Sequence, residues 1–266
     1  MPSGLPHSSR FDELTETTGT PVTAEAARMV YTRYAVGAGL AEGRRVLEIG
    51  CGGGNGLGLL GASAASLVGG DYSAALLTAA KAHYGRRIPL VRLSAERLPF
   101  RRSAFDLVLC FEASYYVPDM DAAFAEIARV LAPRGIVMFV SANPERADFI
   151  PSPYSTRYHR ADEYRAILVA RQFDVTVEGA FPVSPSGAGV RERVAGVARR
   201  TLQTLGLVPS TLRGRARLKG LVFRGLTALP PELPPGFSPV EPRETQPSGP
   251  VRAFKVLYVT AVKRPS

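Results

Sequence analysis

The chain has 266 residues, of which 45% are hydrophobic, and its formal net charge at pH 7 is +10. That length can bury one sizeable core, so one elaborated domain is expected. No stretch approaches the roughly 18 apolar residues of a membrane span, and the first ten residues are not apolar, which favours a cytoplasmic protein. With only Cys51 and Cys110, a framework of disulfides is not expected.

The first predicted element is a helix over Thr23–Leu40, with Thr23 as its N-cap. From Arg44 onward, short runs rich in Val, Leu and Ile alternate with stretches of helix length, as in βαβ units. The runs are nearly continuous in apolar residues, which is typical of parallel strands covered on both faces. The predicted strands are Arg45–Ile49, Ser66–Gly70, Ile88–Leu93, Phe105–Cys110 and Gly135–Val140, and the predicted helices between them are Asn55–Ala65, Ala74–Tyr84 and Met120–Leu131.

The second half of the chain adds two strands separated by a long segment. A Pro-rich loop over Asn143–Pro153 precedes a helix from about Ala161 to Arg171, and strands are predicted at Phe173–Val183 and Ala253–Lys263. The segment Ser184–Pro250 between these strands has ten basic and four acidic residues. It is predicted to hold an amphipathic helix around residues 190–205, a basic helical stretch over 212–226 and an extended Pro-rich part over 230–250. Such a basic segment suits a local acidic partner, and a solvated insert is the alternative.

The strongest chemical signal is a Gly-rich turn at the end of the first predicted strand. Glycines there can adopt positive φ and let the backbone approach a ligand closely. The dinucleotide pattern Gly-x-Gly-x-x-Gly is not met, because Asn55 or Leu57 stands at the third glycine. The pattern is instead Glu-x-Gly-x-Gly-x-Gly, on Glu48, Gly50, Gly52 and Gly54.

This pattern resembles the first motif of class I methyltransferases that depend on S-adenosylmethionine (SAM), particularly the small-molecule group. Asp71 ends the second predicted strand, where an acidic residue can bind both ribose hydroxyls. The run Ser94-Ala95-Glu96-Arg97-Leu98-Pro99-Phe100 resembles the third motif, although Ser94 replaces the usual Asp that contacts the adenine amino group. Phe105–Cys110 followed by Tyr115-Tyr116-Val117-Pro118-Asp119 resembles the fourth, in which relatives often carry His at the tyrosine positions.

The resemblance covers residues 46–140 closely and extends more loosely to 183. It implies a Rossmann-like α/β fold: a seven-stranded, mostly parallel sheet sandwiched by helices, with an N-terminal helical cap and a helical basic insert before the last strand. The expected organisation is a cap over 1–42, a SAM-binding core over 43–183, the insert over 184–250 and the final strand over 251–266.

The resemblance also implies which residues bind SAM. Gly50, Cys51 and Gly52 are expected beside its methionine part, and the backbone near Cys110 and Phe111 beside its amino group. Arg33 could bind the SAM carboxylate, with an exposed helix arginine as the alternative. The complete predicted set is Arg33, Glu48, Gly50, Cys51, Gly52, Gly54, Asp71, Tyr72, Ser94, Ala95, Glu96, Cys110 and Phe111.

Methyl transfer needs a general base only when the acceptor loses a poorly acidic proton. The candidates are Glu112, directly after the fourth strand, and His159. Tyr34, Tyr115 and Tyr116 could face the sulfonium or the acceptor, with core packing as the alternative. The run 151–159 could form a wall of the acceptor site, and no Cys/His cluster has the spacing of a metal site.

These motifs favour an enzyme that transfers a methyl group from SAM to a small organic acceptor, such as a natural product, sugar, quinone or lipid-like molecule. The alternative is a SAM-binding accessory protein without turnover, docked on anionic lipid through the basic insert. A nucleic-acid methyltransferase is disfavoured, because Phe111-Glu112-Ala113-Ser114 stands where base-methylating enzymes commonly carry Asp/Asn-Pro-Pro-aromatic.

Overall fold

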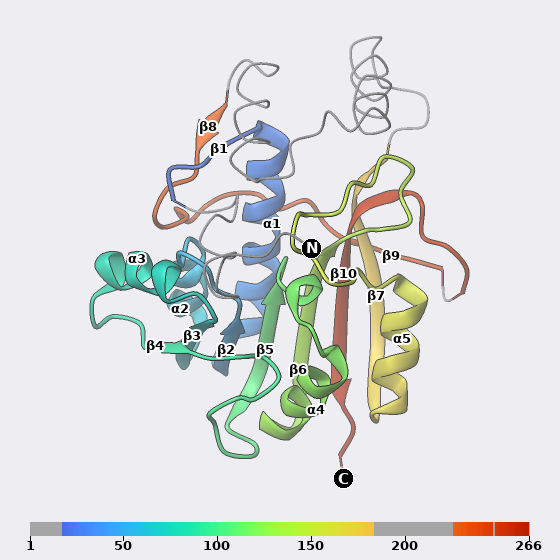
Figure 1. The fold of residues 1–266 in the computed structure, drawn as a ribbon, viewed down its shortest axis with the longest axis horizontal. Coiled ribbons are helices and arrows are strands. Elements are labelled where there is room, and N and C mark those ends of the chain that lie inside the picture. Colours follow the sequence, from blue (N-terminus) through green and yellow to red (C-terminus); the bar gives the residue numbers. More distant parts are fainter. Residues whose placement is uncertain (1–17, 184–225, 247, 266) are drawn as a thin grey trace, which may run out of the picture.

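The computed structural model describes residues 18–183, 226–246 and 248–265, which form an α/β sandwich around a central sheet (Figure 1). The sheet has the strand order β4-β3-β2-β5-β6-β10-β7-β9. The strands from β4 to β6 in this order run parallel, whereas β10 is antiparallel to both of its neighbours. The strands are β2 (Arg45–Ile49), β3 (Ser66–Asp71), β4 (Leu90–Arg92), β5 (Phe105–Phe111), β6 (Leu131–Ala142), β7 (Phe173–Pro182), β9 (Arg243–Glu244) and β10 (Phe254–Lys263).

Five α-helices, a short 3-10 helix over Ser114–Tyr116 and a small second sheet complete the described part of the chain. Helices α1, α2 and α3 pack on one face of the central sheet, and α4 and α5 on the other. The short strands β1 (Pro21–Val22) and β8 (Thr227–Ala228) pair with each other beside α1 (Figure 1). The helices are α1 (Ala24–Ala41), α2 (Leu57–Ser63), α3 (Ala74–Tyr84), α4 (Met120–Val130) and α5 (Ala161–Ala170).

Strand β5 shows why the central strands are mostly apolar, although its Asp106 pairs with Arg45 of β2 at 2.7 Å. Its residues Leu107, Leu109 and Phe111 join the hydrophobic cluster under α1 and α2. Val108 and Cys110 join the cluster under α4 and α5. Because successive side chains of a strand point to opposite faces, a strand covered on both sides has apolar residues on both of its faces.

The helices and strands predicted between residues 23 and 183 are all present. The bounds of α3 are those predicted, and the Ser73 hydroxyl caps this helix by accepting from the Leu76 N–H at 3.1 Å. Thr23 caps α1 in the same way, through the Ala26 N–H at 3.2 Å. The largest difference is at β6, which begins at Leu131, before an irregularity in its register with β5.

The segment 226–246 crosses the face that carries α1 and reaches the far edge of the sheet (Figure 1). Its Leu233 N–H donates to the Asn55 carbonyl at 2.7 Å, and its Phe237 ring stacks on Tyr31 at 4.4 Å between centroids. Its Thr245 hydroxyl donates to the Val177 carbonyl at 2.7 Å. The use of Asn55 in this contact explains why α2 begins at Leu57 and not at Asn55.

The predicted count of seven strands in the central sheet is wrong by one. The additional strand is β9, which pairs with β7 and comes from the segment that was assigned to the insert. Polar edge strands of two residues have no hydrophobic period, so the sequence pattern does not show them. The helices predicted around 190–205 and over 212–226 fall almost entirely outside the described residues. No helix in the described ranges is long and apolar enough to cross a membrane.

An ion pair on α4 holds the loop between β4 and β5. Glu126 and Arg129 pair at 2.6 Å, and Glu126 also accepts from the Leu98 N–H at 2.7 Å. The Arg129 guanidinium donates to the carbonyls of Leu98 at 3.0 Å and Phe100 at 2.7 Å. These bonds fix the Leu-Pro-Phe run against the helix.

Arg129→Met is therefore expected to lower the free energy of unfolding by about 1–3 kcal/mol, because the carbonyls of the loop lose their donor. Urea unfolding followed by circular dichroism measures this change. Arg28→Met, at an exposed position of α1, is the control and should change stability by less than about 0.5 kcal/mol. Equal stability of the two variants would contradict the role of Arg129.

Candidate functional site

The Gly-rich turn follows β2 at the carboxyl edge of the parallel strands. Three of its glycines have positive φ: 77° at Gly50, 56° at Gly52 and 83° at Gly54. The Gly50 N–H donates to the Gly70 carbonyl at 2.8 Å, which ties the turn to β3. A Cβ on Gly50 would lie 2.4 Å from that of Ala113, whereas a Cβ on Gly52 would meet nothing within 4 Å. The turn is thus packed at Gly50 and open at Gly52, as a turn that faces a ligand requires.

Asp71, the last residue of β3, holds this turn by its carboxylate. One oxygen accepts from the Gly52 N–H at 2.8 Å, and the other accepts from the Ser73 N–H at 2.8 Å. The side chain is buried beside the turn. The structure therefore brings Asp71 and the glycines together, as the motif predicts, while the contact of Asp71 with a ribose stays a prediction.

Glu48 lies within β2, directly below the turn, and is fully buried. The Tyr34 hydroxyl, from α1, donates to Glu48 Oε1 at 2.7 Å. Within the described part of the chain, Glu48 Oε2 is buried without a hydrogen-bond partner. Burial raises the pKa of Glu48 to about 7, while the Tyr34 hydrogen bond and the charge of Arg33 lower it and Asp71 raises it. An unused carboxylate oxygen is therefore available next to the turn.

Arg33 and Tyr34 both lie in the interior. Arg33 is only 6% exposed, so the alternative of an exposed helix arginine is wrong. The Tyr34 ring contacts Phe111 edge-on at 5.2 Å between centroids, and a Cβ on Gly56 would lie 2.1 Å from that ring. This arrangement matches the packing alternative for Tyr34, and its contact with an acceptor stays a prediction.

The residues of the third motif bond to one another. The Ser94 hydroxyl donates to Glu96 Oε2 at 3.0 Å, and the Glu96 N–H donates to the Ser94 hydroxyl at 3.3 Å. Glu96 Oε1 accepts from the Asp119 N–H at 2.9 Å, which connects the motif to the start of α4. Ala95 packs at the edge of the core cluster under α4. Ser94 thus stabilises the loop, and its contact with adenine stays a prediction.

The two cysteines are buried, free thiols near the turn. Burial raises the pKa of Cys51 well above its usual range and that of Cys110 to about 12, so both thiols stay protonated at neutral pH. They can line a site but are not activated nucleophiles.

Tyr72 is 40% exposed, and the Arg92 guanidinium lies 5.9 Å from the centre of its ring.

Glu112 directly follows β5 and has a left-handed backbone conformation, with φ of 51°. Its N–H donates to the Val140 carbonyl at 2.7 Å, so its position is fixed to the end of β6. The Tyr115 hydroxyl donates to Glu112 Oε2 at 2.9 Å. Backbone strain held by surrounding bonds is a common feature of functional sites, and it fits the predicted role of Glu112.

A row of aromatic side chains leads from the Glu112 carboxylate to the loop after β6. Tyr115 stacks on Tyr158 at 4.1 Å between centroids, and Tyr158 contacts Phe149 edge-on at 4.7 Å. The Tyr116 hydroxyl lies 2.5 Å from the Ser152 hydroxyl. Tyr158 belongs to the predicted wall of residues 151–159, and the sequence signal that marks it there is its aromatic character in a polar loop.

His159 has a different environment. It is buried, and its ring packs against Tyr164 at 5.4 Å and Phe124 at 6.3 Å between centroids. Burial, followed by the charge of Arg157, lowers the pKa of His159. Its contacts are those of a core side chain under α4 and α5, and a catalytic role for it stays a prediction. Across the described residues, no three His, Cys, Asp or Glu side chains gather as a metal site would need.

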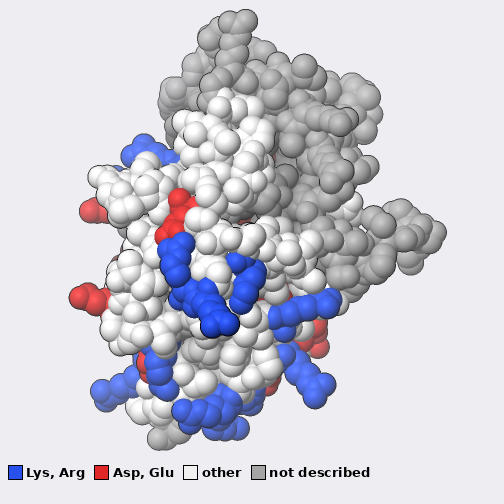
Figure 2. Space-filling model, turned by 90° about the vertical axis from the view of Figure 1, so that its left-hand side faces the viewer, with Lys and Arg blue, Asp and Glu red and all other residues white. Residues whose placement is uncertain are grey.

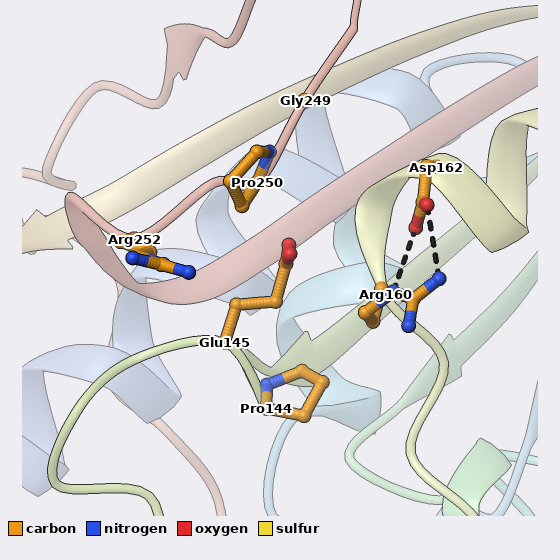
Figure 3. Close-up of a pocket in the computed structure, with 7 residues that line it drawn as sticks. All are labelled: Pro144, Glu145, Arg160, Asp162, Gly249, Pro250 and Arg252. Carbon is orange, nitrogen blue, oxygen red and sulfur yellow. Dashed lines mark hydrogen bonds and ion pairs between the residues drawn. The ribbon is translucent and has the colours of Figure 1, made fainter.

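A pocket of about 460 Å³ lies beyond the end of β6, beside the start of α5 (Figure 3). Three of its four charged side chains have partners: Arg160 pairs with Asp162 at 3.0 Å, and Glu145 accepts from the Val251 N–H at 3.0 Å. None of the predicted site residues lines it. The complete lining is Pro144, Glu145, Arg160, Asp162, Gly249, Pro250 and Arg252.

The buried carboxyl of Glu48 predicts an unusual pH dependence of stability. Its pKa in the folded protein, about 7, lies above the usual 4.5, so folding favours the protonated form. The protonated carboxyl therefore adds to the stability of the fold. This stabilisation, roughly 3 kcal/mol, is fully present below pH 4.5 and is lost as the pH rises through about 7.

Glu48→Gln should remove this loss of stability with rising pH, while the amide oxygen still accepts from the Tyr34 hydroxyl. The measurement is urea unfolding of both proteins between pH 4.5 and 8.5. Glu126→Gln is the matched control, because Arg129 lowers the pKa of Glu126 and its contribution is instead lost as the pH falls. Parallel pH profiles for the wild type and Glu48→Gln would show that the buried carboxyl does not titrate as expected.

Comparison with known proteins shows what this part of the chain resembles. A family model described as a methyltransferase domain matches residues 47–139. A phthiotriol/phenolphthiotriol dimycocerosates methyltransferase of Mycobacterium ulcerans is 36% identical over 121 residues, which cover 42% of this chain and 45% of that protein. A fatty-acid O-methyltransferase of Mycolicibacterium smegmatis is 36% identical over 109 residues, or 39% of each chain. The chain thus spans about half the length of the curated relatives it matches.

The fold is also found among solved structures. A SAM-dependent methyltransferase of Thermotoga maritima aligns with a TM-score of 0.54 and 15% identity, covering 90% of this chain and 95% of that one. This likeness concerns the fold alone. Over residues 47–139 the chain therefore resembles SAM-dependent methyltransferases in sequence, and over most of its length it shares their fold.

Proposed function

We propose that this chain catalyses methyl transfer from SAM to a small, largely apolar organic acceptor. The observation that carries the proposal is the open Gly52 turn, held by Asp71 and lying next to the unused oxygen of Glu48. The two partial relatives act, by their names, on dimycocerosates and on fatty acids, which supports an acceptor of lipid-like character.

The residues at the turn fit SAM chemically. Glu48 Oε2 is a buried acceptor without a donor among the described residues, and SAM carries an ammonium group that can supply one. The Asp71 carboxylate can accept from ribose hydroxyls beside the bonds it already makes. SAM brings a methyl group activated by its sulfonium, so the protein has mainly to bind, orient and exclude water.

The acceptor side is proposed to lie over Glu112 and the aromatic residues Tyr115, Tyr116 and Tyr158. The hydrogen bond from Tyr115 orients the Glu112 carboxylate at the carboxyl end of β5. In this position Glu112 would take the proton that a hydroxyl acceptor loses on methylation. The rings would pack on the apolar part of the acceptor.

The second function considered is SAM binding without turnover, in a protein docked on lipid through residues 184–250. The described part of that segment, from 226 on, is packed on α1 and α2. Residues 184–225 lie outside the described residues, so docking through them stays a prediction. Release of S-adenosylhomocysteine in the presence of an acceptor would separate the two functions.

Asp71→Ala is expected to weaken binding of S-adenosylhomocysteine by roughly 100-fold, because the ribose loses its acceptor and Gly52 loses its support. Isothermal titration calorimetry measures this. Asp71→Asn should be less affected, since one acceptor oxygen remains, and Asp174→Ala on the surface serves as the control. Wild-type protein that is folded yet does not bind S-adenosylhomocysteine would contradict the proposed function.

Glu112→Gln is expected to lower kcat by about 10²–10⁴ on a hydroxyl acceptor while leaving S-adenosylhomocysteine affinity unchanged. A carboxylic-acid acceptor is already ionised, so on hexadecanoic acid the same variant should keep most of its activity. Tyr115→Phe, which removes the hydrogen bond that orients Glu112 but keeps the carboxylate, should have a smaller effect on kcat. A similar loss of kcat on both classes of acceptor would argue against Glu112 as a base.

A further inference from the structure

One side of the molecule carries a broad surface of positive charge. Residues 72–105 include seven basic side chains and a single acidic one, Glu96. All seven are exposed, and they come from the end of α3, the loop after it, β4 and the loop before β5. We refer to them as the α3–β4 basic surface: Lys81, Arg86, Arg87, Arg92, Arg97, Arg101 and Arg102.

Figure 2 shows this side of the molecule, with Lys and Arg side chains gathered at its centre and in its lower part. Few acidic groups neutralise them. Arg87 pairs with Glu232 at 2.9 Å, and among the described residues the other six have no carboxylate within 4.0 Å. Glu96 is directed inward, to Ser94 and the Asp119 backbone. Repulsion between these cations is therefore uncompensated by the described part of the fold.

The make-up of the surface favours a diffuse anionic partner over a folded acidic protein. The centre of a specific protein interface is apolar or aromatic and is depleted in Lys. Within residues 72–105, Tyr72 is the only large hydrophobic side chain that is exposed, at 40%. Its ring lies beside the Arg92 guanidinium. A tyrosine among cations is the combination found where proteins meet lipid headgroups.

We propose that the α3–β4 basic surface docks this protein on an anionic membrane, by binding lipid phosphates. The contact is electrostatic, because the surface offers one aromatic side chain and no apolar helix face for insertion. It lies outside residues 184–250, and it does not depend on the proposed methyl transfer. Since the cations are exposed, the attraction should weaken strongly as salt is raised.

The test is co-sedimentation of the full chain with vesicles of phosphatidylcholine, with and without phosphatidylglycerol, at low and high salt. The docking variant combines Lys81→Gln, Arg86→Gln, Arg101→Gln and Arg102→Gln, which avoids the contacts of Arg87 and Arg92. A matched control changes four other exposed arginines, Arg28, Arg134, Arg243 and Arg252, to Gln. A third variant changes Arg213, Arg215, Arg217 and Lys219 to Gln, to measure any part played by residues 184–250.

We expect wild-type protein to bind only the vesicles with phosphatidylglycerol, and only at low salt. The docking variant should bind at least about tenfold more weakly, while the matched control keeps most of its affinity. Absence of salt-sensitive binding by the wild type, or an equal loss in the docking variant and the matched control, would overturn the proposal. So would loss confined to the third variant, or release from the vesicles by a short RNA duplex that binds the same surface more tightly.

Titration with S-adenosylhomocysteine keeps this proposal separate from the enzymatic one. The docking variant should bind it as tightly as the wild type, because its four substitutions lie outside the Gly-rich turn and the third motif. Vesicle binding without S-adenosylhomocysteine binding would remove the proposed function and leave the docking surface. Binding of S-adenosylhomocysteine without vesicle binding would remove the docking surface and leave the proposed function.

Discussion

The geometry of the candidate site depends on the two hydrogen bonds that Asp71 accepts. One comes from the turn after β2 and the other from the residue that caps α3. A single carboxylate thus fixes the relative positions of two adjacent strand ends and of the helix that follows. Because backbone N–H groups bonded to a charged acceptor are among the stronger hydrogen bonds of a protein, the turn is ordered before any ligand arrives.

Directly below the ordered turn, the buried carboxyl of Glu48 carries an electrostatic cost in free energy. Glu48 is a carboxyl group in a low-dielectric interior, and among the described residues it has one donor, Tyr34, and one oxygen without a partner. Such a group destabilises the free protein when it is ionised. Its ionised form becomes stabilised when a cationic or hydrogen-bond-donating ligand binds beside it. Stability and ligand affinity are therefore coupled through the same side chain, as is common where function sets the choice of residue.

The sequence predicted most of the central fold, because the information is local. Strand β5 is apolar at every position from Leu107 to Phe111, the glycine spacing marks the turn, and Ser73 and Thr23 stand where caps are needed. The contacts that could not be predicted join residues far apart in the chain. Nothing near Asn55 indicates that Leu233 will donate to it, and nothing near Glu48 indicates that Tyr34 of α1 will be its partner.

The site was predicted unevenly for the same reason. The residues next to strand ends, such as Asp71 and Glu112, are placed by the order of parallel strands, whose carboxyl ends share one edge. His159 follows a long loop, so its environment is set by tertiary packing, and it lies among core aromatic rings. The β9 strand escaped prediction because two polar residues pair at the sheet edge by their backbones alone.

The position of β10 has a consequence for how the molecule assembles during synthesis. β10 is the last strand in the sequence, yet it lies between β6 and β7. Until the ribosome has released residues 254–263, β7, its partner β9 and the adjoining α5 have no strand that links them to the parallel part of the sheet. The Gly-rich turn can thus form early from residues 45–71, whereas the far third of the sheet has to wait until residues 254–263 have been synthesised.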